Sequence, residues 1–366
     1  MGVLLLNEIE WSDPPLVGPT DLSPELRKYV KKLVGGVPLA IEYIGRSRWI
    51  VDGYLSVFAY APTALPHRTF HLVSFVVSQA NACRYCYGSA RSTLRIMGFS
   101  EATVSRIERD LQVAEVTERD SAMLQVLRAL ANANPMPTPE AVTRLAALGF
   151  SPPAIAEAIY SAGMTCLSNR LATCLALPPD DAFEKMAQNP IVKLFRPLVS
   201  WKMRKTAESN VAEIDGVPAT PPDAAFGSVI NGLGDSPAAA FLARIVSSCL
   251  ADGTTIPRRA KLLMFAVVAR ALASGPVFRE VHRLLVAENL APDSIASIVD
   301  RLGGDELTPL EQKLIPFARD TARYQTPAMQ ERTRELSALV DDSELIEAVA
   351  TAGLANAVVR IALLSP

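Results

Sequence analysis

The stretch HLVSFVVSQANACRYCYGSAR, residues 71–91, decides the fold of this 366-residue chain. Its apolar residues Leu72, Phe75 and Val76 recur at the three- and four-residue spacing of one helix face. Small and polar residues then interrupt the pattern, and a second helical pattern begins at Cys83. The stretch therefore predicts a helix, a tight turn and a second helix.

The composition extends this helical pattern to the whole chain. Of all residues, 49% are hydrophobic and only 6% are aromatic, and the apolar residues are mainly Ala, Leu and Val. Abundant Ala and Leu favour packed helices over sheets. Gly98 is a typical end for the helix that begins near Cys83, and Ser100 is a typical cap for the next. We therefore expect an all-α fold.

The chain matches itself at a shift of about 191 residues. Residues 65–68 (LPHR) lie over 256–259 (IPRR), and Thr117 lies over Thr308. The register slips by one near the end, where Gly163 meets Gly353. Aligned prolines and helix caps are not expected from composition alone. This length also favours two domains. The two repeats span about 20–180 and 220–366.

Proline clusters near residues 177–181 and 218–222 suggest the domain boundaries. We expect a first domain over 1–180, a linker over 181–217 and a second domain over 218–366. Residues 191–205 of the linker are basic and amphipathic. They fit a connector that packs its large apolar residues (Phe195, Leu198 and Trp201) against one lobe, or a helix lying on a membrane surface. Because Pro197 would interrupt an interfacial helix, we favour the connector.

Cys83 and Cys86 form the one closely spaced pair among five cysteines. At positions i and i+3 both thiols face one side of a helix, so a reversible disulfide is within geometric reach. The first turn of a helix favours a thiolate, and Arg84 and Arg91 are expected to add to this effect. Such a placement suits thiol redox chemistry.

Other interpretations of a Cys-x-x-Cys motif are open at this stage. A structural zinc site needs four ligands, and no second Cys or His pair accompanies this one. A thioredoxin-like site needs a preceding strand, whereas the preceding pattern is helical. Structural coincidence remains a competing interpretation. The three other cysteines lie in apolar helical contexts and are expected to be buried (Cys166, Cys174 and Cys249).

Residues 77–86 (VSQANACRYC) and 97–100 (MGFS) resemble alkylhydroperoxidase D-like proteins of the carboxymuconolactone decarboxylase family. The resemblance covers roughly residues 60–175 and reaches the second half only through the repeat. It implies two tandem alkylhydroperoxidase D-like helical domains, with Cys86 attacking the peroxide and Cys83 resolving the product. Since such domains assemble through their helices, it also implies a monomer or a homodimer.

The chain departs from the pattern of active members, which carry a glutamate twelve residues before the first cysteine and a histidine four after the second. His71 and Ala90 stand at these positions. His71 is a candidate substitute base, and a half-buried histidine with another role is the competing interpretation. In the second repeat Ser274 and Val277 replace the cysteines, and His282 is a weaker candidate to face the thiols.

The resemblance and the thiol pair together suggest a thiol-dependent, peroxidase-like oxidoreductase. Its substrate would be a hydroperoxide or another small organic molecule, and an external dithiol would reduce Cys83 and Cys86. One alternative is a regulatory or binding protein on the same fold, as in the two-lobed sestrins. Another is a non-redox enzyme, decarboxylase-like or biosynthetic, that uses His71 or Arg91. We expect no bound cofactor and no metal.

Charge limits the partners of the chain. Thirty-six basic and 38 acidic residues give a formal net charge of −2, so no overall field attracts nucleic acid or an anionic membrane. The first residues (MGVLLLNEIEW) have too short an apolar run and no basic start for a signal peptide. We therefore expect a cytoplasmic protein with neither nucleic acid nor membrane as a partner.

Overall fold

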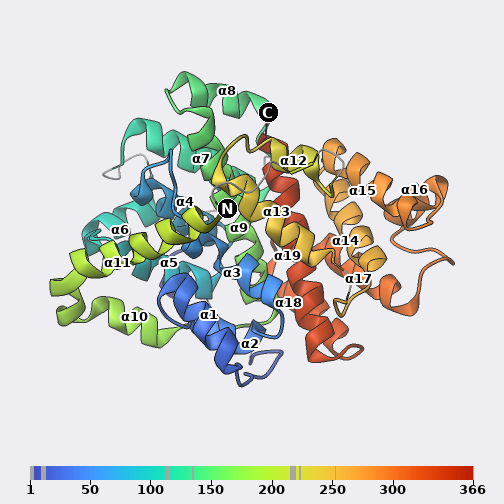
Figure 1. Cartoon of the computed structure of the whole chain (residues 1–366), viewed down its shortest axis with the longest axis horizontal. Coiled ribbons are helices and arrows are strands. Elements are labelled where there is room, and N and C mark those ends of the chain that lie inside the picture. Colours follow the sequence, from blue (N-terminus) through green and yellow to red (C-terminus); the bar gives the residue numbers. More distant parts are fainter. Residues whose placement is uncertain are drawn as a thin grey trace.

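The computed structural model describes residues 4–9, 14–111, 116–133, 136–214, 220–221, 224–251 and 253–365. Within these ranges every regular element is a helix, so the all-α prediction is confirmed. Figure 1 shows the first half of the chain, in blue to green, beside the second half, in orange to red. The long helices α9 (Pro152–Cys174) and α19 (Asp342–Leu364) meet between them.

The helix bounds follow the repeat register. Helix α4 (His67–Ala80) and helix α14 (Arg258–Ala271) begin and end 191 residues apart. The same offset separates α5 (Arg84–Ile96) from α15 (Gly275–Ala287). Helices α9 and α19 have 23 residues each and are offset by 190, which is the one-residue slip seen in the sequence. The repeat is thus present at the level of whole helices.

The other helices of the repeat recur in the same order. They are α3 (Arg48–Ala59) with α13 (Pro237–Cys249), α6 (Glu101–Arg109) with α16 (Pro292–Arg301), α7 (Glu118–Asn132) with α17 (Pro309–Asp320), and α8 (Pro139–Ala147) with α18 (Thr326–Ser337). The remaining helices are η1 (Leu6–Glu8), α1 (Pro24–Val34), α2 (Leu39–Ile44), α10 (Asp181–Gln188), α11 (Pro190–Ile214) and α12 (Gly227–Asn231).

Side-chain caps set several of these boundaries. Ser100 accepts a hydrogen bond from the Thr103 amide at the start of α6, as the sequence predicts. Thr117 and Thr308 cap α7 and α17 in the same way. Gly98 ends α5 with a φ of +92°, a left-handed conformation that glycine adopts without strain. Local chemistry therefore positions the helices around the motif.

The two repeats pack through α9 and α19, which are buried along nearly their whole length. A Cβ on Gly163 would lie 3.2 Å from the carbonyl oxygen of Ala357, and one on Gly353 would lie 3.2 Å from that of Leu167. These contacts are equivalent under the 190-residue offset, so each repeat presents its glycine to the other. One continuous hydrophobic core results.

Two buried glutamates hold the turns that precede α4 and α14. Glu157 accepts a hydrogen bond from the Leu65 amide at 2.7 Å, just before α4. Glu347, its counterpart on α19, accepts one from the Ile256 amide at 3.3 Å, just before α14. Because carboxylates satisfy buried backbone amides strongly, these pairs hold both turns in the same shape.

Helix α19 is long and apolar enough to cross a membrane by composition alone. In the fold, 94% of its most apolar window is buried against other helices. Its apolar character is therefore explained by its place in the protein core.

The expected linker, 181–217, contains α10 and α11, and its boundary at 217–218 lies outside the described residues. Helix α11 runs through Pro197 without ending. The expectation that Phe195, Leu198 and Trp201 pack against one lobe is wrong, because all three side chains are exposed. The C-terminal half of α11 packs on the first repeat instead, where Ala207 and Val211 are buried. The two domains themselves remain a proposal.

Candidate functional site

The turn between α4 and α5 places both thiols of the Cys-x-x-Cys motif. Ala82 adopts a φ of +48°, which reverses the chain after α4. Cys83 is then the N-cap of α5, and Cys86 is the third residue of that helix. The second repeat forms the same turn, with Ala273 at a φ of +55° and Ser274 as N-cap. Both repeats therefore form this turn, whereas only the first repeat carries the two thiols.

The two thiols are free and nearly enclosed. Cys83 has no exposed surface, whereas Cys86 is 9% exposed. The two side chains lie at the start of α5, three residues apart, and each acts on the pKa of the other. A small molecule that enters the site from solvent therefore meets Cys86 first.

Helix α9 forms one wall of the thiol site. The Cys83 thiol lies 3.8 Å from the carbonyl oxygen of Asn169. The side-chain amide of Asn81 donates to Asn169 Oδ1 at 2.8 Å, and that of Asn169 donates to Ser78 Oγ at 3.1 Å. Because Ser78 and Asn81 flank the bend before Cys83, this network fixes the turn against α9.

The second repeat contributes Tyr324 to the same site. The Tyr324 hydroxyl donates to the carbonyl oxygen of Asn169 at 2.9 Å and contacts the Thr173 hydroxyl. Tyr324 and Thr173 are also among the groups that lower the pKa of Cys83. The sequence did not point to Tyr324, because the repeat register places it over Ala133, far from the motif. The site is therefore shared between the repeats.

The surroundings act on the two thiols in opposite directions. Burial raises the pKa of Cys83, but hydrogen bonds from Cys86, Thr173 and Tyr324 outweigh it and leave that pKa below its usual value. Burial raises the pKa of Cys86 well above its usual value, and the hydrogen bond and charge of Cys83 raise it further. Of the two sulfurs, Cys83 is the better place for a negative charge.

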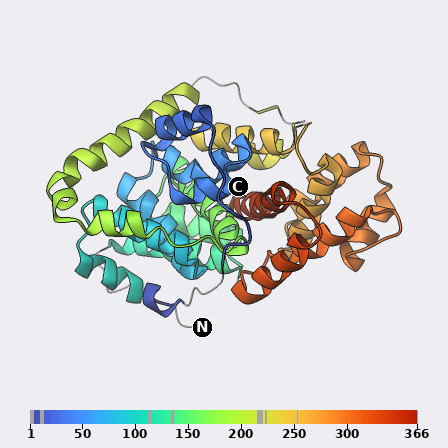
Figure 2. The same cartoon turned by 90° about the horizontal axis from the view of Figure 1, so that it is seen from below.

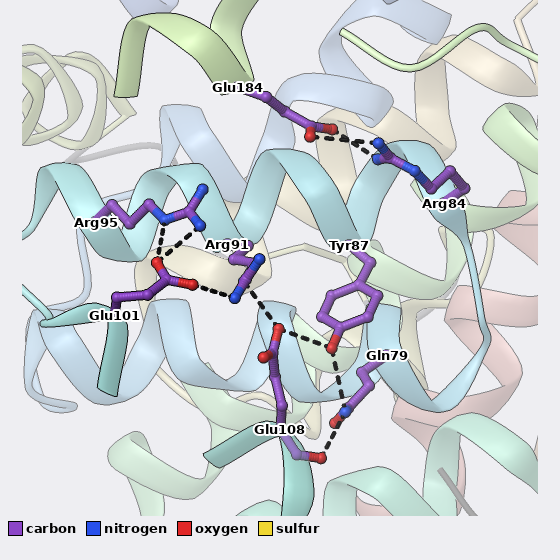
Figure 3. Close-up of polar contacts among 8 residues, drawn as sticks. All are labelled: Gln79, Arg84, Tyr87, Arg91, Arg95, Glu101, Glu108 and Glu184. Atoms are coloured by element: carbon purple, nitrogen blue, oxygen red, sulfur yellow. Dashed lines mark hydrogen bonds and ion pairs between the residues drawn. The ribbon is translucent and has the colours of Figure 1, made fainter. Parts of the chain in front are cut away.

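Arg84 and Arg91 do not act on the thiols as expected from the sequence. Arg84 pairs with Glu184 of α10 at 2.6 Å, and Arg91 Nε lies 2.9 Å from Glu108 Oε1. Figure 3 shows both guanidinium groups directed to these carboxylates, and Arg91 also pairs with Glu101. Since each charge is neutralised locally, the arginines fasten α5 to α6 and α10.

The same close-up contains a buried polar cluster beside α5. The Tyr87 hydroxyl donates to Glu108 Oε1 at 2.9 Å, and Gln79 Nε2 donates to the Glu108 carbonyl oxygen at 2.7 Å (Figure 3). Burial raises the pKa of Glu108, with the nearby charge of Arg91 opposing that shift. The cluster holds the end of α6 against α4 and α5.

His71 lies in the N-terminal part of α4, away from the thiol turn. It is buried, and its ring lies 4.7 Å from that of His67 and 5.7 Å from that of Phe70. Nine residues separate it from Ala80, or about 13 Å along a helix. Burial, with a smaller contribution from the charge of His67, lowers the pKa of His71 to about 3. His71 is therefore held as neutral imidazole.

The other sequence candidates lie elsewhere. His282 sits on α15 with its ring 6.5 Å from that of Phe278, and α15 packs on α14, α16 and α19. The three remaining cysteines are fully buried, as predicted, and burial raises the pKa of two of them to about 12 (Cys174 and Cys249). Within the described ranges, no three His, Cys, Asp or Glu side chains gather as metal ligands.

Comparisons with known proteins give one family and one solved structure similar to part of the chain. The model of the carboxymuconolactone decarboxylase family matches residues 48–131, from the start of α3 into α7. A solved structure of an alkylhydroperoxidase AhpD core, an uncharacterized peroxidase-related protein from Ralstonia eutropha JMP134, is similar at 19% identity and a TM-score of 0.43. That match covers 49% of this chain and 100% of the other. A search among curated proteins gives no match.

Proposed function

We propose, on the premise that the chain belongs to the carboxymuconolactone decarboxylase family through residues 48–131, that it is a thiol-dependent, peroxidase-like oxidoreductase. Cys83 and Cys86 would alternate between a dithiol and a disulfide. The observation that carries this proposal is the placement of two free thiols at the start of α5, with Cys83 as N-cap and Cys86 as third residue. Adjacent sulfurs in one turn form a disulfide with little backbone movement.

The two thiols also suggest what replaces the glutamate and the histidine that active family members carry. Burial raises the pKa of Cys83, but Cys86 and the other neighbours lower it below its usual value, so Cys83 is the sulfur that ionises first. Cys86 therefore passes its proton to the Cys83 thiolate in the attacking step itself, which makes Cys86, the more exposed sulfur, the nucleophile. Cys83 thus acts as the local base and then as the resolving thiol, and the second of these roles is the one that the family resemblance implies.

The reaction balances with a hydroperoxide as the oxidant. Cys86 thiolate attacks the terminal peroxide oxygen, the O–O bond breaks, and the alkoxide leaves and takes the Cys83 proton to give an alcohol. Cys83 thiolate then attacks the Cys86 sulfenic acid, the S–S bond forms, and hydroxide leaves and is protonated by solvent. An external dithiol reduces the disulfide by thiol–disulfide exchange.

Stoichiometric oxidation tests the proposal. After one equivalent of an organic hydroperoxide, peptide mass spectrometry of the full chain should find a Cys83–Cys86 disulfide and one equivalent of alcohol. Cys86→Ser should abolish peroxide consumption. Cys83→Ser lacks both the base and the resolving thiol, so it should consume peroxide more slowly and leave the oxidised Cys86 as sulfenic acid. Cys249→Ala, which removes a buried thiol of the second repeat, is the matched control and should behave as wild type.

Two results would overturn the proposal. If both thiols remain reduced while the peroxide persists, the chain is not a peroxidase of this type, and a binding or regulatory role becomes the better interpretation. If turnover survives in the Cys83→Ser/Cys86→Ser double variant, the chemistry belongs to another site.

A further inference from the structure

Helix α11 exposes an apolar stripe in its N-terminal half. Five large side chains are at least half exposed: Ile191 (67%), Leu194 (75%), Phe195 (51%), Leu198 (59%) and Trp201 (50%). They make up half of the ten exposed large hydrophobic residues in the described ranges. Their three- and four-residue spacing places them on one helix face. A concentration of this kind marks a surface that is covered by something else.

The helix that carries the stripe is held firmly by its other half. The side-chain amide of Asn210 donates to the carbonyl oxygens of Leu33 and Ala59 at 2.9 and 3.0 Å. Lys32 pairs with Glu213 at 2.6 Å. Figure 2 shows α11 running along the outer edge of the first repeat. The stripe is therefore presented outward by an anchored helix.

The chain around the stripe is strongly basic, although the protein as a whole is slightly acidic. No acidic residue lies between Glu184 and Glu208, and six basic residues do: Lys185, Lys193, Arg196, Lys202, Arg204 and Lys205. Glu208 neutralises part of this charge, because it lies 2.8 Å from Lys205 and 3.5 Å from Arg204. The partner that covers the stripe should consequently carry negative charge.

A cationic groove adjoins the stripe at Trp201. It has a volume of about 430 Å³ and lies between α11, the start of α4 and the turn after α5, with Arg68, Arg196, Arg204 and His67 in its wall. The Arg68 guanidinium lies 4.2 Å over the Phe99 ring, and Arg196 Nε is buried without a hydrogen-bond partner among the described residues. These donors suit the phosphate of a lipid headgroup.

We infer that the N-terminal half of α11 docks the protein on an anionic phospholipid surface. The apolar stripe enters the headgroup and acyl boundary, the basic side chains face the lipid charge, and the groove takes a phosphate group. A second copy of this chain fits less well, because a two-fold contact through the same face would bring two sets of six cations together. This inference is independent of the proposed thiol chemistry.

Vesicle binding by the full chain tests the inference. The protein should cosediment with vesicles of phosphatidylcholine mixed with phosphatidylglycerol and remain in the supernatant with phosphatidylcholine alone. Leu198→Glu should weaken binding at least about tenfold, since it places a charge in the apolar boundary. The matched control is Leu339→Glu, because Leu339 is 58% exposed on another part of the surface and should not contribute.

Separate measurements test the cationic groove and the apolar stripe. Arg68→Gln/Arg196→Gln should weaken binding and flatten its dependence on salt, because fewer charges meet the lipid. The Trp201 emission, taken as the difference between wild type and Trp201→Phe, should shift to the blue with anionic vesicles. Far-ultraviolet circular dichroism should show that every variant retains the wild-type helix content.

Three outcomes would overturn the inference. The first is a protein that stays in the supernatant with anionic vesicles. The second is equal binding to neutral and anionic vesicles. The third is a dimer in sedimentation equilibrium that Leu198→Glu dissociates and Leu339→Glu does not, which would assign the stripe to contact between copies.

Discussion

Arg170 and Arg360 occupy equivalent positions on α9 and α19, and each donates a hydrogen bond to a backbone carbonyl of the other repeat. Arg170 Nε lies 2.9 Å from the carbonyl oxygen of Thr321, and Arg360 Nε lies 3.1 Å from that of Leu130. Both arginines are fully buried. Since Leu130 and Thr321 end equivalent helices, the guanidinium groups meet the negative ends of α7 and α17.

These crossed hydrogen bonds predict that removing Arg360 lowers the stability of the protein more than removing Arg170. Arg360 also donates to the carbonyl oxygens of Ala131 and Ala322, at 3.3 and 2.9 Å. Arg360→Met would leave buried carbonyls without donors and should lower the free energy of unfolding by about 3 kcal/mol. Arg170→Met should cost less, because fewer contacts are lost. Urea titration of both variants measures the difference.

The control for these variants is Arg301→Met, which removes an exposed arginine from the last turn of α16. It should unfold within about 0.5 kcal/mol of wild type. An Arg360→Met protein that unfolds at the wild-type urea concentration would show that the crossed contacts contribute little.

The close approach of α9 and α19 predicts that neither Gly163 nor Gly353 accepts a side chain. A Cβ at position 163 would lie 2.7 Å from Ile361 Cγ1, closer than real contacts allow. Gly163→Ala should therefore destabilise the protein by roughly 1 to 3 kcal/mol through overpacking. Thermal unfolding by calorimetry gives the measurement, and Gly303→Ala, with open space around its Cβ, is the control. Equal melting temperatures would contradict the packing argument.

His71 predicts a dependence of stability on pH. Its folded pKa of about 3 lies below the ordinary 6.5, so the unfolded chain binds more protons between these values. The stabilisation is complete above about pH 6.5 and is lost as pH falls toward about 3. From about pH 7 to about pH 5 the loss should reach about 2 kcal/mol. Urea titrations at both pH values measure it.

His71→Gln should remove this part of the pH dependence and leave the rest. An unchanged pH profile in His71→Gln would mean that the folded protein accepts a charged imidazole at this position.

Much of the fold follows from local signals in the sequence. Ser100, Thr117 and Thr308 predict helix starts because a side-chain cap acts within three residues. The repeat register at Gly163 and Gly353 likewise appears as a one-residue slip. The helix–turn–helix that carries the thiols is predictable for the same reason.

The surroundings of the thiols are not predictable in this way. Tyr324 reaches Asn169 across 155 residues of sequence, and no local pattern encodes such a contact. The predicted effect of Arg84 and Arg91 on the thiols is wrong for the same reason. Glu184 and Glu108, which are distant in sequence, form ion pairs with these arginines. The exposure of Trp201 also depends on how α11 packs, which its amphipathic pattern leaves open.

The contact between Tyr324 and Cys83 predicts that the second repeat tunes a thiol of the first. Tyr324→Phe removes a hydroxyl that lowers the pKa of Cys83, so this pKa should rise. Iodoacetamide labelling across a pH series, with peptide-resolved mass spectrometry, gives the pKa of Cys83. Tyr43→Phe, a half-buried tyrosine of α2, is the control.

A merely structural role for Tyr324 makes a different prediction. Loosened packing would speed the labelling of Cys83 at every pH without moving its midpoint, whereas loss of the donor moves the midpoint upward. The hydrogen-bond argument also requires peroxide oxidation to slow most at pH values just below the new midpoint, because proton transfer from Cys86 to Cys83 needs Cys83 as the thiolate. A labelling midpoint that stays in place in Tyr324→Phe would assign the tyrosine to packing alone.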